Sequence, residues 1–163
     1  MSRRLPLLER LEESARGAPA FELRALNHGA GDLELEVWQV PSPATPQVKE
    51  PQRVAGLRGR NLALVESGVL KRLGRQGHSL AGLMPGERTG WRLDEDTALS
   101  LGLLFRTLAP MRSRANMTAC AAAIEAMGRE EAAYWLGMAM HRKNPRRVLA
   151  ALRLLLVEPE GGR

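Results

Sequence analysis

The sequence predicts a mainly α fold of the α+β class, in which a C-terminal bundle of about four to five helices carries a small N-terminal β-hairpin. Two observations predict it. Leucine and alanine are abundant while aromatic residues make up only 4% of the chain, which favours a helical core over a β-sandwich. Between Trp91 and Val157, four helical patterns follow one another, with short breaks at Pro110, Gly128 and Asn144-Pro145.

The chain length of 163 residues is that of one domain. We therefore expect residues 1–163 to form a single domain. Its expected segments are an N-terminal helix and β-hairpin at 1–40, a Pro-rich linker at 41–52 and a helical bundle at 53–163. Within the first segment, residues 4–16 have leucines at helical spacing and predict a short amphipathic helix.

Residues 21–40 predict the β-hairpin, because FELRAL and DLELEVWQV alternate apolar and polar residues around the turn-forming NHGAG. Two strands alone are only marginally stable, so this hairpin must pack on a helix or meet strands of another chain. We therefore expect its exposed edge to be a protein–protein contact. The residues expected on the buried faces are Phe21, Leu23, Ala25, Leu33, Leu35 and Val37, with Glu34, Glu36 and Trp38 opposite.

The middle of the chain begins with residues 41–52, whose four prolines predict an extended linker. Residues 53–74 predict a helix despite three glycines, because Val54, Leu62, Val65, Val69 and Leu73 cluster on one side at 100° per residue. Residues 76–92 contain repeated glycine and one proline, and predict a surface loop.

The first two helices of the bundle have clear start signals. Asp94 is a good N-cap for a helix that runs to about Ala109, and its many leucines predict burial on most sides. Asn116 is the expected cap of the next helix, at about 117–127, whose small residues allow close packing.

Two further helices complete the predicted bundle. Gly128 is the expected C-cap that precedes a helix with core residues Tyr134, Trp135, Met138 and Met140. Asn144 caps the last one, with Pro145 at its first position.

Catalytic and metal motifs do not emerge from the sequence. The three histidines lack ligand spacing, and no nucleophile elbow, phosphate-binding glycine loop or dinucleotide fingerprint is present. Cys120 is the one cysteine, which excludes an intrachain disulfide and a cysteine-based zinc site. The acidic run Asp94–Asp96 could hold a divalent cation, but a helix start explains it more simply. We therefore expect no enzyme activity, no cofactor and no metal. With no secretory signal and no membrane span, we expect a cytoplasmic location.

The charge of the chain says more about a partner than the catalytic and metal motifs do. The net charge is +6, and it is uneven: residues 1–52 hold 6 Lys/Arg and 8 Asp/Glu, whereas residues 53–163 hold 18 and 10. Such a basic half indicates a polyanionic partner or an acidic protein surface. Arginine outnumbers lysine by 21 to 3, which a GC-rich genome could produce by itself.

The clustered basic residues are the candidate nucleic-acid contacts. Arginine forks match phosphate geometry, and a row of them follows a nucleic-acid backbone without reading bases. The alternative is a solvated face with no partner. The candidates are Arg53, Arg60, Lys71 and Arg75 in the 53–75 region, Arg112 and Arg114 at a helix corner, and Arg142, Lys143, Arg146, Arg147 and Arg153 along the last helix.

A helix-turn-helix at 117–140 is a second alternative, because Gly128 separates two short helices. However, Glu130 and Glu131 start the second helix, where a recognition helix would meet phosphates. Tyr134 and Trp135 are also more useful in a core.

From Leu101 to Val157 the chain resembles a family of small uncharacterised bacterial proteins encoded in anti-phage defence loci. The resemblance rests on LGLLFRTLAPMR, MGREEAAYW and the terminal RVLAALRLLLVEP. The size, the basicity and the helical C-terminal half of the chain are also similar to those of small helical subunits of CRISPR effector complexes, which line a nucleic-acid path without doing chemistry. The N-terminal hairpin departs from that pattern. The resemblance implies a non-enzymatic accessory subunit of a defence or DNA-processing complex, bound to larger protein subunits. A protein–protein interaction adaptor with an acidic partner and a helix-turn-helix-like regulator are the alternatives.

Overall fold

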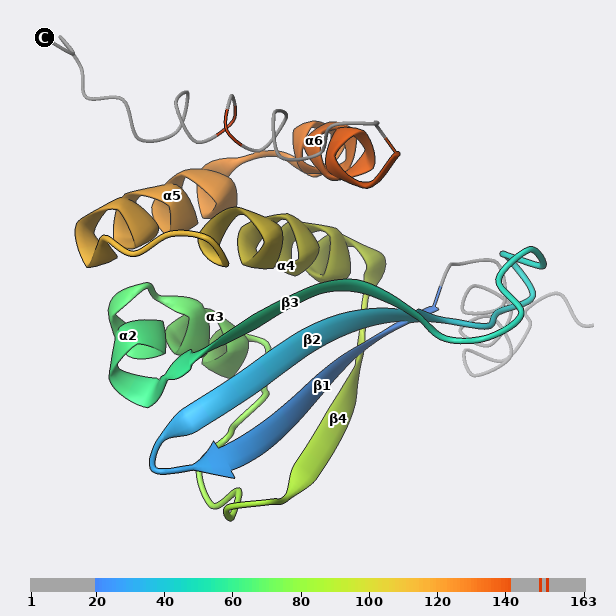
Figure 1. The fold of residues 1–163 in the computed structure, drawn as a ribbon. Coiled ribbons are helices and arrows are strands. Elements are labelled where there is room, and N and C mark those ends of the chain that lie inside the picture. The colour runs from blue at the N-terminus through green and yellow to red at the C-terminus, as the bar shows by residue number, and fades with distance from the viewer. Residues whose placement is uncertain (1–19, 142–149, 151, 153–163) are drawn as a thin grey trace, which may run out of the picture.

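The structure, a computed structural model, describes residues 20–141 together with Ala150 and Leu152. The predicted N-terminal helix at 4–16 and nearly all of the predicted last helix lie outside the described residues. The described part contains four strands and five helices (Figure 1): β1 Ala20–Gly29, β2 Asp32–Val40, β3 Gln52–Arg60, α2 Asn61–Glu66, α3 Val69–Arg75, β4 Arg88–Leu93, α4 Glu95–Leu108, α5 Arg114–Ala126 and α6 Arg129–His141.

The strands form one antiparallel sheet in the order β3-β2-β1-β4. The predicted hairpin is its centre, and β1 pairs with β2 from Ala20↔Val40 to Gly29↔Asp32. The turn between the two strands uses the left-handed region, with φ of 55° at Ala30 and 77° at Gly31. The predicted faces are confirmed, since Phe21, Leu23, Ala25, Leu33, Leu35 and Val37 are all buried.

The predicted fold class is wrong, because the N-terminal half holds a four-stranded sheet and not a lone hairpin. The helix predicted from residue 53 is instead β3 followed by two short helices, and the loop predicted at 76–92 ends in β4. Gly56 and Gly59 each lower helix propensity by about 1 kcal/mol relative to alanine. Pairing of β3 with β2 buries Val54, Ala55 and Leu57 in the core.

The edges of the hairpin are therefore not exposed. β3 pairs along β2, and β4 pairs along β1 from Phe21↔Leu93 to Leu26↔Arg88. The expectation that the hairpin edge forms a protein contact is wrong for this reason: the chain supplies both neighbouring strands itself.

Helix α4 lies between the sheet and the helices α5 and α6, and contacts β1, β2, β3 and both helices (Figure 1). Asp94 is its N-cap and accepts a 2.8 Å hydrogen bond from the backbone N–H of Thr97, as predicted. All residues from Leu101 to Phe105 are buried, so the expectation of burial on most sides is confirmed. Gly102 permits close contact, because a Cβ there would lie 3.2 Å from Leu136 Cδ2 and 3.3 Å from Val54 Cγ1.

The helices α5 and α6 differ in detail from prediction. Ser113, not Asn116, is the N-cap of α5, and its Oγ accepts a 3.3 Å hydrogen bond from the Asn116 N–H. In α6, residues at positions i, i+4 and i+7 face the core, and they are Ala132, Leu136 and Ala139. Tyr134 is therefore 59% exposed and is not a core residue.

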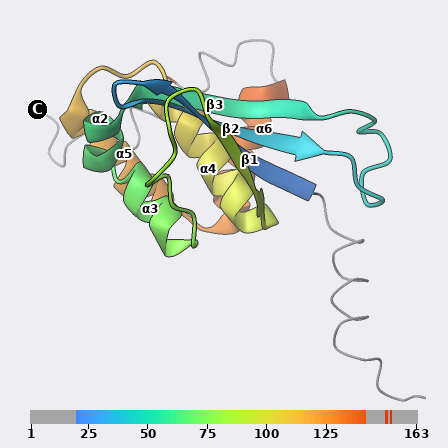
Figure 2. The same cartoon turned by 90° about the horizontal axis from the view of Figure 1, so that it is seen from below.

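The short helices α2 and α3 lie beside α5, near the end of the sheet that holds the β1–β2 turn (Figure 2). The backbone N–H of Asn61 donates to the carbonyl oxygen of Gly31 at 2.6 Å, which ties α2 to that turn. Gly68, with φ of 81°, separates the two helices, so the residues of α3 do not continue the faces of α2. Leu64, Val69 and Leu73 are consequently buried, whereas Leu62 and Val65 are exposed. No described helix has the length and apolarity to cross a membrane.

Candidate functional site

A cavity of about 210 Å³ lies between α2–α3 on one side and α5 on the other, above Leu104 of α4. We call it the α3–α5 groove. Its lining is rich in charged and hydroxyl-bearing side chains and includes three cations from one short helix. The lining residues are Glu66, Ser67, Gly68, Lys71, Arg72, Arg75, Leu104, Thr118, Ala121, Ala122 and Glu125.

Helical spacing explains which residues face the groove. In α3, Val69 and Leu73 are buried in the core, which leaves Lys71, Arg72 and Arg75 on the side toward α5. In α5, positions i, i+3, i+4 and i+7 line the groove, and they run from Thr118 to Glu125. The small alanines between them keep the space open.

Two ion pairs cross the groove or its rim. Arg75 of α3 pairs with Glu125 of α5, and Arg114 Nη1 of α5 lies 3.1 Å from Glu66 Oε2 of α2. The Thr118 hydroxyl lies within hydrogen-bond distance of the carbonyl oxygens of Glu66 and Arg114, at 2.8 and 2.9 Å. The charged side chains are partly exposed, so each pair contributes at most about 1 kcal/mol. Their main effect is to fix α5 against α2 and α3.

Arg72 is the least solvated cation of the groove. One of its guanidinium nitrogens, Nη2, donates to Ser100 Oγ on α4. A second one, Nη1, is buried and has no acceptor among the described residues. Burial lowers the pKa of Arg72, and the charge of Arg75 acts in the same direction, whereas Glu125 opposes it. A buried donor without a partner costs about 1–3 kcal/mol.

The structure brings together only part of the predicted basic set. Lys71 and Arg75 line the groove. Arg114 lies at its rim, where it pairs with the lining residue Glu66. Arg112 is exposed in the link before α5. The other two described members belong to β3 and not to a helix: Arg53 near its start and Arg60 at its end. The remaining predicted residues, Arg142, Lys143, Arg146, Arg147 and Arg153, lie outside the described residues.

Three groove residues were missed from the sequence: Arg72, Glu66 and Glu125. Arg72 stands between two predicted cations, and a helix that starts at Val69 places it beside Arg75. The single long helix expected at 53–74 assigned these residues to the wrong helical faces, because α2 and α3 are separate helices. The two carboxylates could be found only from the packing of α5 against α2 and α3.

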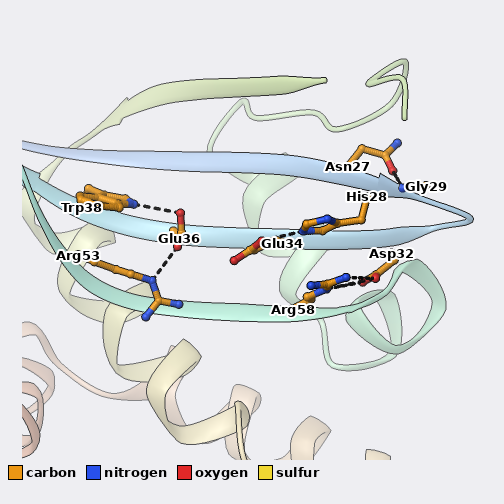
Figure 3. A network of polar contacts seen from close by, with 9 residues as sticks. All are labelled: Asn27, His28, Gly29, Asp32, Glu34, Glu36, Trp38, Arg53 and Arg58. Carbon is orange, nitrogen blue, oxygen red and sulfur yellow. Dashed lines mark hydrogen bonds and ion pairs between the residues drawn. The ribbon is translucent and has the colours of Figure 1, made fainter. Parts of the chain in front are cut away.

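The open face of the sheet, opposite the helices, has a different character (Figure 3). Three of its arginines, Arg24, Arg53 and Arg58, pair with carboxylates of the central strands. Arg53 Nε donates to Glu36 Oε2 at 2.7 Å, and Arg58 Nη2 donates to Asp32 Oδ2 at 2.8 Å. The hydrogen bond from Arg58 lowers the pKa of Asp32. This face is therefore a mixed-charge network, and Arg53 is separated from the groove cations.

An aromatic contact completes the network on the open face. The Arg24 guanidinium lies 4.4 Å from the centroid of the Trp38 ring, and Trp38 Nε1 donates to Glu36 Oε1 at 3.2 Å. Both faces of the molecule thus contain arginines, but among the described ones only Arg72, which lines the groove, has a buried guanidinium nitrogen without an acceptor. Among those same residues, no group of three or more His, Cys, Asp or Glu side chains is placed to hold a metal ion.

Residues 21–158 match the family model DUF7680, described as a domain of unknown function. The chain belongs to this family. The DUF7680 match includes the whole sheet from Phe21 onward, the groove, and the stretch from Leu101 to Val157 on which the sequence resemblance depends. The description of the DUF7680 family gives no activity. No curated protein and no solved structure matches the chain.

Proposed function

We propose that this DUF7680 protein is a non-enzymatic accessory subunit that contacts a nucleic-acid backbone through the α3–α5 groove and its rim. The further assignment to a bacterial anti-phage defence or DNA-processing complex rests on the resemblance of Leu101–Val157 to proteins encoded in such loci. In this proposal, larger protein subunits complete the complex.

The observation that carries the proposal is the convergence of distant cations on one groove. Lys71 and Arg75 come from α3, and Arg114 comes from α5, roughly 40 residues later in the chain. Arg72 adds a fourth cation between them, against the two carboxylates Glu66 and Glu125. Convergent arginine and lysine side chains suit phosphate groups, which they position without reading sequence.

The distribution of charge supports a polyanionic partner, and it adds the C-terminal segment to the groove as a candidate contact. Residues 20–141 hold 14 Lys/Arg and 13 Asp/Glu, whereas residues 142–163 hold 6 and 2. Most of the positive excess therefore lies in the C-terminal segment. Cations of this kind attract a polyanion irrespective of its sequence and make binding sensitive to salt.

The test is a fluorescence anisotropy titration of labelled single-stranded and duplex DNA between about 50 and 200 mM salt, the range over which phosphate contacts weaken. We expect binding at low salt that weakens steeply as salt rises. The variant Lys71→Glu should bind at least about tenfold more weakly and show a salt slope reduced by about 1. Lys49→Glu is the matched control, because Lys49 is exposed and remote from the groove in sequence.

A separate double reversal, Arg146→Glu/Arg153→Glu, tests the C-terminal segment. The circular dichroism spectrum of each variant should equal that of the wild type, which excludes unfolding as the cause. Absence of binding to either DNA at the lowest salt would contradict the proposal. Weakening by Lys49→Glu equal to that of the groove variant would contradict the site.

The protein–protein adaptor is the second candidate, and one observation favours it. Arg75 and Arg114 already pair with carboxylates, so fewer cations of the groove are free to meet phosphate groups. Co-purification of neighbouring gene products without nucleic acid would support it. The helix-turn-helix alternative predicts a two-fold symmetric DNA site in a selection experiment.

A further inference from the structure

Arg72 separates two cavities. Its side chain lines the α3–α5 groove and also a second cavity of about 240 Å³ between α3, the start of α4 and the α5–α6 junction. Glu125 lines both cavities as well. The hydrogen bond from Nη2 to Ser100 Oγ holds the guanidinium to α4. Arg72 is therefore anchored to α4, in contrast to the exposed Lys71 beside it.

The guanidinium of Arg72 is incompletely satisfied. A guanidinium has five N–H donors in a rigid fork and no acceptor. The buried Nη1 meets no acceptor among the described residues. Nη1 has almost no accessible surface, so an anion in the groove would meet it only after a small shift of the guanidinium. Such a shift would give this costly unpartnered donor an acceptor.

The charge of the groove also favours a multiply charged anion. Its two carboxylates are already engaged, Glu125 by Arg75 and Glu66 by Arg114. These pairs leave Lys71 and Arg72 as the cations without a carboxylate of their own among the described residues. Two such charges match a phosphate dianion better than a carboxylate. The volume of about 210 Å³ is smaller than the roughly 300–1,000 Å³ of ordinary small-molecule sites, so a phosphate group fits and a large ligand does not.

We propose that the α3–α5 groove binds one phosphate group, with Arg72, which is anchored to α4 through Ser100, and the exposed Lys71 as its donors. The phosphate group belongs either to a nucleic-acid backbone, in which case the inference rests on the proposed function, or to a small phosphorylated metabolite. Both sources share the same chemistry at Arg72. Glu125 competes with the phosphate, since its carboxylate lies close enough to Arg72 to stabilise the charged guanidinium.

The experiment uses the full chain and inorganic phosphate as the probe, by isothermal titration calorimetry and by the shift in Tm. Sodium chloride at matched ionic strength is the reference. We expect phosphate to raise Tm where chloride does not. Lys71→Gln should weaken phosphate binding at least about fivefold, and Arg72→Lys at least about tenfold, since loss of a charge-assisted hydrogen bond has an effect of this size. Lys49→Gln removes the same charge as Lys71→Gln and should leave binding unchanged.

Glu125→Gln keeps the inference testable even if Arg72→Lys does not fold. Removal of the competing carboxylate should strengthen phosphate binding about threefold or more, by the size of a nearby charge effect. If Glu125 were instead the permanent partner of Arg72, the variant would lower Tm and leave phosphate affinity unchanged or weaker. That result, or equal Tm shifts by phosphate and chloride, would overturn the inference.

Two further arms distinguish the source of the phosphate. A labelled oligonucleotide that inorganic phosphate displaces, and that Lys71→Gln weakens, supports the backbone as the source. A sugar monophosphate that binds at the groove while oligonucleotides do not supports a phosphorylated metabolite. In the second case the phosphate site stands and the proposed nucleic-acid contact fails.

Discussion

Arg106 of α4 donates a 2.8 Å hydrogen bond from its Nε to the backbone carbonyl oxygen of Val54 in β3. Val54 is the extra residue of an irregularity in the β2–β3 ladder, where Val37 pairs with Ala55 and Trp38 pairs with Arg53. An extra residue of this kind has no partner on the neighbouring strand. Burial lowers the pKa of Arg106. The helix therefore supplies the hydrogen bond that the sheet cannot.

Arg106→Met should destabilise the protein by about 1–3 kcal/mol, because the variant leaves the Val54 carbonyl oxygen without this donor. Arg106→Lys should recover part of the loss. The measurement is the free energy of unfolding in urea. Arg92→Met is the control, since Arg92 is exposed on β4, and an equal loss in the two variants would contradict the role of the hydrogen bond.

Gly102→Ala and Gly137→Ala should change stability in opposite directions. A methyl group at Gly102 meets Leu136 and Val54 at 3.2 and 3.3 Å, so we expect a net loss of about 1 kcal/mol from overpacking. No heavy atom of the described residues lies within 4 Å of a Cβ at Gly137 of α6. There, the better helix propensity of alanine should add about 0.5–1 kcal/mol. Thermal unfolding of both variants checks the signs; a stabilising Gly102→Ala would refute the close approach of α4, α6 and β3.

Ser113→Ala should destabilise the protein by about 1 kcal/mol, because it removes the N-cap of α5. Asn116→Ala should change stability by less than about 0.5 kcal/mol, the usual range for an exposed surface position. Asp94→Ala, at the confirmed N-cap of α4, provides a reference for the size of a cap effect. If Asn116→Ala were the more harmful of the two α5 substitutions, the helix would begin later than Ser113.

His78 should make stability depend on pH. Its ring stacks on Trp91, with centroids 5.0 Å apart, and burial lowers its pKa below the usual 6.5. As pH falls through 6.5, the unfolded chain binds a proton that the folded chain resists, so the free energy of unfolding must decrease and then level off below the folded-state pKa. His78→Phe keeps a ring that can stack on Trp91, but this ring binds no proton and so removes the pH dependence that His78 causes. The difference between wild type and variant, measured by urea unfolding from pH 8 to pH 5, should therefore change with pH below about 7; a constant difference would contradict the shift.

The parts of the fold that the sequence predicts are those set by local pattern. Alternation identifies the two faces of β1 and β2, and Asp94 identifies the start of α4. β3 and β4 are different, since their pairing with β2 and β1 overrides local propensity. Residues Val54, Leu62 and Val65 match a helical period, yet Val54 is in a strand and the other two are exposed.

The candidate site also divides into residues that local sequence pattern predicts and residues that only the packing of the helices reveals. Lys71 and Arg75 are recognisable as basic residues at helical spacing. That Arg72 is buried, and that Glu66 and Glu125 neutralise part of the groove, follows only from the packing of α5 beside α2 and α3. A count of arginines therefore overstates the free positive charge of the described residues, since Arg53, Arg58, Arg75 and Arg114 each pair with a carboxylate.

The pairing of β1 with β4 has a consequence for synthesis on the ribosome. β1, β2 and β3 are consecutive in the chain and can pair as they emerge. Leu23 of β1, however, can pair with Trp91 of β4 only after roughly 70 more residues have been synthesised. Until then the outer edge of β1 lacks its neighbour, as does the apolar face that α4 later covers. At ordinary elongation rates of about 5–20 residues per second, this interval lasts several seconds. A nascent chain that ends before Leu93 should therefore recruit chaperones, whereas one that extends past α4 should not.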